Sequence, residues 1–168
     1  MSAAVQVSLA EYLSTDYEPD CEYIDGVLED RNVGKSKHSR TQALLTMWLG
    51  SREKQHGHKV MIEQRVQISR SRVRIPDICL VLKDDQDEVV QHPPLLWIEI
   101  LSPDDRWSRV QAKLADVLRF GVGTIWIIDP FLRQAWMATQ DMPATEVDTL
   151  RCDHLGLEVP LNEVLPED

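Results

Sequence analysis

One strand-like run, residues 95–101, constrains this chain most strongly because it is apolar except for a single carboxylate, Glu99. Continuous apolar runs of this length are typical of strands that are buried on both faces. An ionised carboxylate that is buried without a partner strongly destabilises a fold whose net stability is small. Glu99 is therefore expected to meet a cation, a set of hydrogen-bond donors or a water-filled cleft.

A second strand-like run, residues 75–82, carries the same anomaly at Asp77. Side chains alternate across a strand, so the two carboxylates emerge on one face if the strands are neighbours in a suitable register. Such a pair suits a hard divalent cation, Mg²⁺ (or Mn²⁺), which polarises a phosphoryl oxygen. The alternative is that each acid pairs with an arginine or sits at a strand end. Two such burials together favour a shared site.

The order of the larger elements predicts the architecture. A strand at 95–101, a helix at 106–120 and a strand at 124–129 form a crossover unit, so the two strands are expected to be parallel. Asp104 or Asp105 is expected to cap the helix. The resulting fold class is α/β (α+β), with a mixed β-sheet flanked by helices.

The length predicts a single domain covering residues 1–168, with a core at about 20–165. The tail is expected to add one or two edge strands and a last helical turn at 161–164. Other expected elements are a helix at 8–14 capped by Ser8, a hairpin turning at Asp25-Gly26, a helix at 36–53 ended by Gly57 and a strand at 60–68. The helix at 36–53 is expected to bury Ala43, Leu44, Met47 and Trp48.

Charge and cysteine content limit the partners and the compartment. The net charge of −10 argues against non-specific nucleic-acid binding, although basic residues gather at 31–74 and 106–119 and leave room for a local basic surface. The three cysteines form no Cys-x-x-Cys pair, which favours the reducing cytoplasm. No membrane span is expected, and residues 1–6 lack the pattern of a signal peptide.

Lys113 is the third residue with a possible chemical role. It falls at the edge of the apolar arc of the helix at 106–120, so its ammonium could point along the sheet towards the two acids. A lysine in that place could orient or activate a water and offset charge on a phosphorane-like transition state. The alternative is that its stem covers apolar surface while the charge reaches solvent.

An ordered set of motifs spans roughly residues 20–165. They are Glu22-Tyr23-Ile24-Asp25-Gly26, His38, Pro76-Asp77, Glu99-Ile100-Leu101-Ser102-Pro103, Lys113, Gly121-Val122 and Trp126-Ile127-Ile128-Asp129-Pro130. In this order they resemble the PD-(D/E)XK nuclease superfamily and, more specifically, the Uma-type family of restriction-endonuclease-like proteins. The resemblance implies that Asp77 and Glu99 are metal ligands. Leu101 stands where the superfamily has a lysine, which implies that the lysine role has moved to Lys113.

The resulting hypothesis is a Mg²⁺- or Mn²⁺-dependent endonuclease of restriction-endonuclease-like fold that hydrolyses DNA phosphodiester bonds, acting as a homodimer. The Ile100 carbonyl is a further candidate ligand. Glu22 is expected to support the metal, or else to be an exposed acid beside the hairpin. His38 is expected to contact substrate or a carboxylate, or else to lie on the surface. Two other functions stay open: a catalytically inactive binding or regulatory module with the same fold, and an RNA-directed nuclease.

Overall fold

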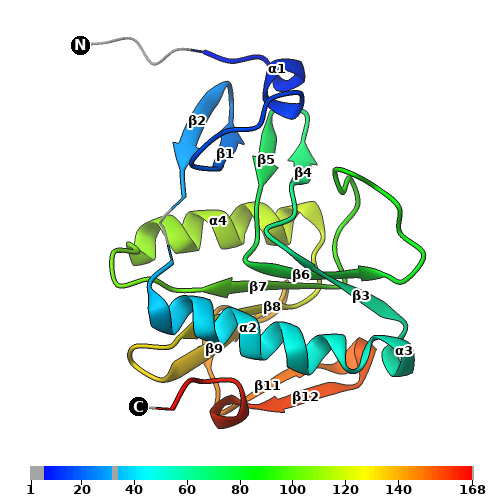
Figure 1. The fold of residues 1–168 in the computed structure, drawn as a ribbon, viewed down its shortest axis with the longest axis vertical. Coiled ribbons are helices and arrows are strands. Elements are labelled where there is room, and N and C mark those ends of the chain that lie inside the picture. Colours follow the sequence, from blue (N-terminus) through cyan, green and yellow to red (C-terminus); the bar gives the residue numbers. More distant parts are fainter. Residues whose placement is uncertain (1–5, 32–33, 168) are drawn as a thin grey trace.

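The protein, described by a computed structural model over residues 6–31 and 34–167, is built around a six-stranded mixed sheet in the order β10-β9-β8-β7-β6-β3. Helix α2 (Ser36–Gly50) packs on one face of this sheet and α4 (Trp107–Phe120) on the other (Figure 1). The predicted mixed sheet flanked by helices is therefore confirmed. The strands are β3 (His58–Ile62), β6 (Ile78–Leu82), β7 (Leu96–Ile100), β8 (Ile125–Asp129), β9 (Gln134–Ala138) and β10 (Thr145–Glu146).

The crossover unit forms as predicted. Strands β7 and β8 pair in parallel, with Glu99 opposite Ile127, and α4 connects them. The other pairings in this sheet are antiparallel. Gly121 ends α4 at a φ of 112°, a conformation that glycine adopts without a Cβ penalty. The N-cap of α4 is Arg106 rather than an acid, and Asp105 instead accepts a hydrogen bond from the Ser102 amide.

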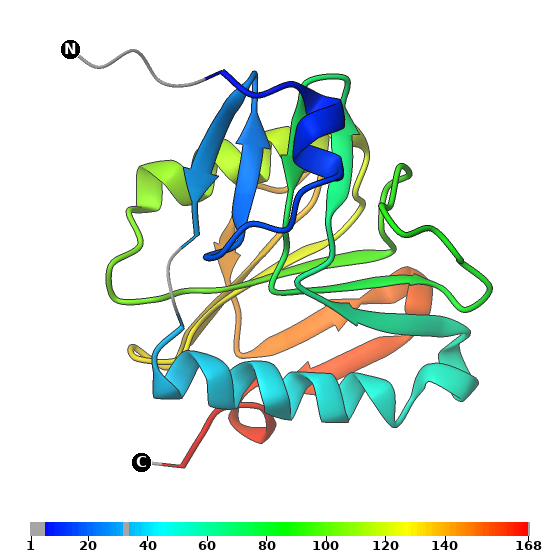
Figure 2. The ribbon, with the colours of Figure 1, turned by 45° about the horizontal axis from the view of Figure 1, so that its top comes forward.

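A second sheet, with strands in the order β2-β1-β5-β4, lies beyond α4, so that this helix is sandwiched between the two sheets (Figure 1, Figure 2). The predicted Asp25-Gly26 turn joins β1 to β2, and both residues have positive φ. Helix α1 (Leu9–Leu13), capped by Ser8 as predicted, covers this sheet through Tyr12. The strands are β1 (Cys21–Ile24), β2 (Val27–Asp30), β4 (Val66–Ser69) and β5 (Arg72–Arg74).

The chain passes between the two sheets at two places where a single strand was expected. Residues 60–68 divide into β3 and β4 at Glu63, whose φ is 50°, because β3 pairs with β6 while β4 pairs with β5. On the way back, residues 75–77 join β5 to β6, and Pro76 supplies no amide donor for a ladder. Asp77 therefore lies just before a strand, where the two sheets meet.

The C-terminal residues complete the layer that contains α2. Strands β11 (Thr149–Cys152) and β12 (Leu157–Pro160) pair with each other as a separate sheet, whereas β10 is the expected edge strand. Short 3-10 turns occur at Asp153–Leu155 and Leu161–Glu163, the second near the expected final helical turn. After α2, the short helix α3 (Glu53–His56) ends at Gly57, which has a φ of 70°.

The predicted buried stripe of α2 is wrong at Ala43 and Met47, which are exposed, whereas Trp48 is partly buried against the core. Thr41, Leu45 and Leu49 are buried at spacings of four residues, whereas Met47 is 58% exposed. Local apolar content suggested the other stripe, but the face that meets the sheet is selected by the branched aliphatic side chains that fit between α2 and β7.

The three cysteines are free, buried and widely separated. Cys21 belongs to the apolar cluster under α1, Cys79 to the cluster between the large sheet and α4, and Cys152 to the cluster around α2.

Among the described residues no helix is long and apolar enough to span a bilayer. The N-terminal pattern discussed above falls mostly on residues 1–5, which lie outside the described part of the chain.

The phase of α2 can be tested by paired alanine substitutions. L45A should lower the free energy of unfolding by about 2–5 kcal/mol because it leaves a cavity against the sheet. M47A should change it by less than about 0.5 kcal/mol, since this side chain is exposed. Urea unfolding followed by circular dichroism measures both values. Equal losses would show that the assigned face of α2 is incorrect.

Candidate active site

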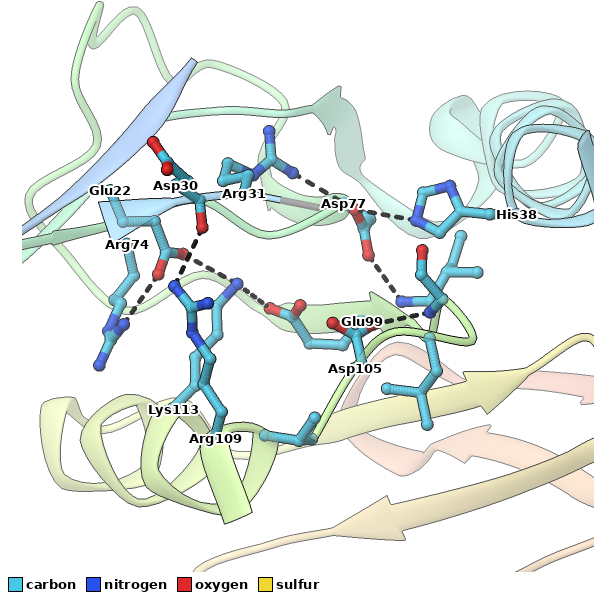
Figure 3. A pocket seen from close by; sticks show the side chains of 14 residues that line it. Glu22, Asp30, Arg31, His38, Arg74, Asp77, Glu99, Asp105, Arg109 and Lys113 are labelled. Atoms are coloured by element: carbon cyan, nitrogen blue, oxygen red, sulfur yellow. Dashed lines mark hydrogen bonds and ion pairs between the residues drawn. The ribbon is translucent and has the colours of Figure 1, made fainter. Parts of the chain in front are cut away.

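Asp77 and Glu99 lie on neighbouring strands and face the same side of the large sheet. Strands β6 and β7 are antiparallel with Ile78 opposite Ile98, so the register continued by one residue sets Asp77 opposite Glu99. The Ile100 amide donates a 2.6 Å hydrogen bond to Asp77 Oδ2, which fixes this carboxylate on the β7 side (Figure 3). The two acids therefore line one cavity beneath α4.

Lys113 extends from α4 into this cavity rather than towards solvent (Figure 3). Its Nζ is 2.7 Å from Glu99 Oε1, 2.9 Å from Glu22 Oε1 and 2.9 Å from the Ile75 carbonyl oxygen. An ammonium group has three donors, so all of them meet an acceptor. Burial opposes the charged form, but Glu22, Glu99 and Asp77 outweigh it and raise the pKa of Lys113.

Glu22 reaches the site from β1 and is buried, not an exposed acid beside the hairpin. It accepts hydrogen bonds from the Ile75 amide at 2.8 Å and from Arg74 at 2.8 Å. Burial alone would raise the pKa of Glu22, but Lys113, Arg74 and the Ile75 amide together lower it to about 2. Glu22 is therefore a permanently ionised counter-charge for the lysine.

The two facing acids differ in their electrostatic surroundings. Burial raises the pKa of Glu99 to about 7, with Asp77 and Glu22 adding to the rise and Lys113 opposing it. Burial also opposes ionisation of Asp77, but the hydrogen bond and charge of His38, the charge of Lys113 and the Ile100 amide lower its pKa below the usual range. Glu99 Oε1 also accepts a 2.6 Å hydrogen bond from Trp97 Nε1, so Trp97 and Lys113 contact the same oxygen of Glu99.

His38 and Arg31 both contact Asp77 Oδ1. His38 is buried in the first turn of α2, and its Nε2 lies 3.4 Å from that oxygen. Arg31 Nη2, from the end of β2, lies 3.3 Å from the same atom. Burial lowers and Asp77 raises the pKa of His38, with a net increase. His38 therefore contacts a carboxylate and does not lie on the surface.

Several charged residues of the site were not anticipated from the sequence. Arg74 is buried at the end of β5, although Arg70 and Arg72 just before it give this segment the composition of a solvated one. Asp116 is buried one turn after Lys113 on α4, a position that its neighbours alone do not distinguish from a solvated one. Others line the cavity entrance, namely Asp30, Arg31, Asp105 and Arg109.

The donor set fits a hard divalent cation. Asp77 and Glu99 supply carboxylate oxygens on one face, and Ile100, whose carbonyl is the third candidate ligand, lines the same cavity. Within residues 6–31 and 34–167, the contacts of Glu99 with Trp97 and Lys113 both use Oε1, which leaves Oε2 as the oxygen for another ligand. Lys113 separates Glu22 from Glu99, so Glu22 belongs to the lysine rather than to the carboxylate pair.

A different cluster has the tighter metal-like spacing. In the described part of the chain, only Asp85, Asp87 and His92 place three ligand atoms within 4.8 Å of one another. These residues lie in the loop between β6 and β7, and they line a separate hollow that shares no residue with the cavity around Lys113. His92 Nε2 pairs directly with Asp85 Oδ2 at 2.5 Å.

The fold and the cavity define a restriction-endonuclease-like protein, and the comparison with protein families gives the same class. The Uma2 family model, described as "Putative restriction endonuclease", matches residues 9–168. The chain therefore belongs to the Uma2 family, as its motifs predicted. No curated protein gives a match.

Comparison with solved structures also bears on the fold, which the first of the following two supports. A putative nuclease of the DUF820 group from Anabaena variabilis superposes with a TM-score of 0.83 at 22% identity, covering 94% of this chain and 97% of the other. The DrdV–DNA complex, determined by cryo-electron microscopy, gives a TM-score of 0.49 at 17% identity. That alignment covers 78% of this chain but 11% of the other, and it adds nothing to the fold assignment.

The role of Glu22 as a counter-charge predicts how stability depends on pH. Its folded-state pKa of about 2 is below the ordinary value of 4.5, so ionised Glu22 stabilises the fold above pH 4.5 and loses this effect as the pH falls towards 2. E22Q should lower the free energy of unfolding at pH 7 by about 1–3 kcal/mol. It should also flatten the change in that free energy between pH 4.5 and pH 2.

Urea unfolding at a series of pH values measures both effects. E88Q is the matched control, because Glu88 is exposed and this substitution removes the same charge. An E22Q protein with the same acid-side slope as the unmodified protein would contradict the assignment.

Proposed function

We propose that this protein is a metal-dependent endonuclease that hydrolyses DNA phosphodiester bonds. One observation carries the proposal: Asp77 and Glu99 face each other across β6 and β7 in a cavity that also contains the ammonium of Lys113. Two oxygen donors next to a cation are what phosphodiester hydrolysis requires for charge stabilisation. Membership of a family of restriction-endonuclease type supports the same reaction class.

Asp77, Glu99 and the Ile100 carbonyl would hold Mg²⁺ or Mn²⁺. When bound, such an ion polarises the phosphodiester and lowers the pKa of a water next to it. The chain's own residues provide the rest. His38, Arg31 and the Ile100 amide hold the Asp77 carboxylate in one orientation, and Trp97 does the same for Glu99.

Lys113 is proposed to position the attacking water and to offset charge on the transition state. Leu101, directly after β7, occupies the place where the superfamily has a lysine, and Lys113 reaches Glu99 Oε1 at 2.7 Å from α4 instead. This contact supports the proposal that the lysine role has moved from the strand to the helix. Glu22 keeps the lysine charged in its buried position.

Cationic groups at the cavity entrance support a nucleic-acid substrate despite the overall net charge of −10. Arg31 and Arg109 line the cavity, and the side chain of Arg109 is half exposed. Guanidinium groups in such a place can contact phosphates in two-point geometry. We propose duplex DNA as the substrate, cut by a homodimer in which each subunit hydrolyses one strand. Sedimentation with and without duplex DNA measures the stoichiometry.

A cytoplasmic location is proposed from the three free, buried thiols, which fit a reducing compartment.

A second function, a binding or regulatory module that retains the fold, is favoured by the Lys113 ammonium, whose three donors are already used by protein acceptors. A nucleic-acid cleavage assay separates the nuclease from the binding module. Comparing DNA and RNA as substrates in that assay separates a DNA nuclease from an RNA-directed one.

The protein is expected to cleave plasmid or single-stranded DNA in the presence of Mg²⁺ or Mn²⁺. D77A, E99A and K113M should each reduce the rate by at least about 100-fold, because each removes a group that acts at the reacting phosphate. Gel analysis of time courses, with RNA as a parallel substrate, gives the rates.

D87A is the matched control for this assay, since Asp87 belongs to the separate acidic cluster. It should cleave at the rate of the unmodified protein. Loss of cleavage in D87A together with normal cleavage in D77A would place the metal in that other cluster. Absence of cleavage above the level of D77A and E99A would favour the binding module.

Lys113 and a divalent cation both interact with Glu99, so removing the lysine charge should strengthen metal binding while it abolishes cleavage. K113M is expected to bind Mn²⁺ roughly tenfold more tightly, given the Coulomb energy of a unit charge at such a distance. K54M removes the same charge at an exposed site and should not alter the affinity. Isothermal titration calorimetry measures these affinities, and weaker binding by K113M would count against competition at Glu99.

A further inference from the structure

Arg74, the last residue of β5, is buried between two acids that come from different elements. Its Nη1 lies 2.8 Å from Glu22 Oε2 on β1, and its Nη2 lies 2.7 Å from Asp116 Oδ2 on α4. The side chains of all three residues are less than 10% exposed. The two halves of the planar guanidinium fork therefore face Glu22 and Asp116 in a fixed geometry, and Nη1 also lies 3.6 Å from Glu29 Oε2 on β2.

These contacts close a ring that begins and ends on α4. Asp116 follows Lys113 by three residues, so the two side chains leave the same face of the helix one turn apart. Lys113 contacts Glu22 Oε1, Arg74 contacts Glu22 Oε2, and Arg74 returns to Asp116. Arg74 thereby holds Glu22 Oε2, while the Ile75 amide binds Oε1, the oxygen that is turned towards the lysine.

Stability alone is a poor explanation for this ring. Buried ion networks often contribute no more to stability than well-packed apolar side chains would. In addition, Arg74 Nε is buried without a hydrogen-bond partner among the described residues, which is unfavourable. Networks retained in spite of such a cost are typical of sites whose side chains need one fixed orientation.

We propose that Arg74 and Asp116 are positioning residues that act on Lys113 through Glu22. The inference rests on the proposed nuclease function and deepens it. Without Arg74, Glu22 Oε2 loses its partner, and among the described residues only the Ile75 amide and Lys113, both at Oε1, still hold this carboxylate. Glu22 is then held less firmly as one of the three acceptors that direct the Lys113 ammonium towards Glu99. The turnover number then falls, while the binding of substrate, which uses groups at the cavity entrance, does not change.

Arg72 offers a matched control on the same strand. It lies two residues before Arg74, so its side chain is on the same face, and its Nη1 also contacts Asp116 at 2.7 Å. Its remaining contacts go to Asp25 instead of Glu22. R72M therefore removes an arginine from Asp116 without touching the Glu22–Lys113 contact.

The first experiment is NMR spectroscopy of the full chain without added metal. A buried ammonium with three acceptors exchanges slowly with water, so Lys113 should give a resolved ¹H–¹⁵N ammonium signal, identified by its loss in K113M. R74M and R74K should shift or broaden this signal, with the smaller change in R74K, and R72M should leave it in place. An unchanged Lys113 signal in R74M and R74K would overturn the positioning role.

The second experiment is steady-state cleavage of DNA. R74M should lower kcat at least tenfold, with KM within twofold of the unmodified protein. The kcat of R74K should lie between those of R74M and the unmodified protein. R72M should have the kcat and KM of the unmodified protein. R74K keeps the charge, so it decides the question if R74M does not fold. A loss of kcat that only follows the folded fraction, measured by circular dichroism, would indicate a purely structural role and overturn the proposal.

The NMR and cleavage experiments together test the positioning role of Arg74 separately from the nuclease assignment. If the unmodified protein cleaves no nucleic acid, the proposed function fails, and the positioning of Lys113 is still decided by its ammonium signal. If the unmodified protein cleaves DNA but R74M and R74K retain both the signal and kcat, the nuclease assignment stands and the positioning role is rejected.

Discussion

The ammonium of Lys113 is the contact on which the rest of the structure depends. Its three acceptors come from β1, from the segment between β5 and β6, and from β7. The cation on α4 therefore joins the small sheet to the large one at a single point. Because a buried cation is tolerated only when its donors are paired, this contact determines the geometry of the cavity, while apolar side chains of β4, α4 and the large sheet pack the layers together.

Elements that bury a continuous apolar surface were predictable from the sequence. Strands β7 and β8 and helix α4 appear close to their expected ranges, because burial of their own side chains decides their conformation. The division of residues 60–68 was not predictable in the same way. Its first half, β3, pairs with β6, and its second half, β4, pairs with β5. Strand pairing is a tertiary property, so the alternation of apolar and polar residues along the chain does not predict it.

The cavity shows the same division between local and tertiary information. Asp77 and Glu99 stood out because their apolar neighbours make a lone charge costly, and the structure brings them together with Lys113. Arg74 and Asp116 carry no such signal, since Arg74 follows Arg70 and Arg72 in a charged segment and an acid on a helix is ordinarily solvated. A carboxylate contact was one expectation for His38, and the structure shows that its partner is Asp77, which joins α2 to the start of β6.

The distribution of the cysteines gives the protein a built-in set of folding reporters. Each of the three hydrophobic clusters contains one free thiol, Cys21 under α1, Cys79 beneath α4 and Cys152 beside α2. A thiol sealed in a core reacts only when that core opens. The order in which the three are labelled under mild denaturation therefore reads out which layer of the molecule separates first, without any engineered probe.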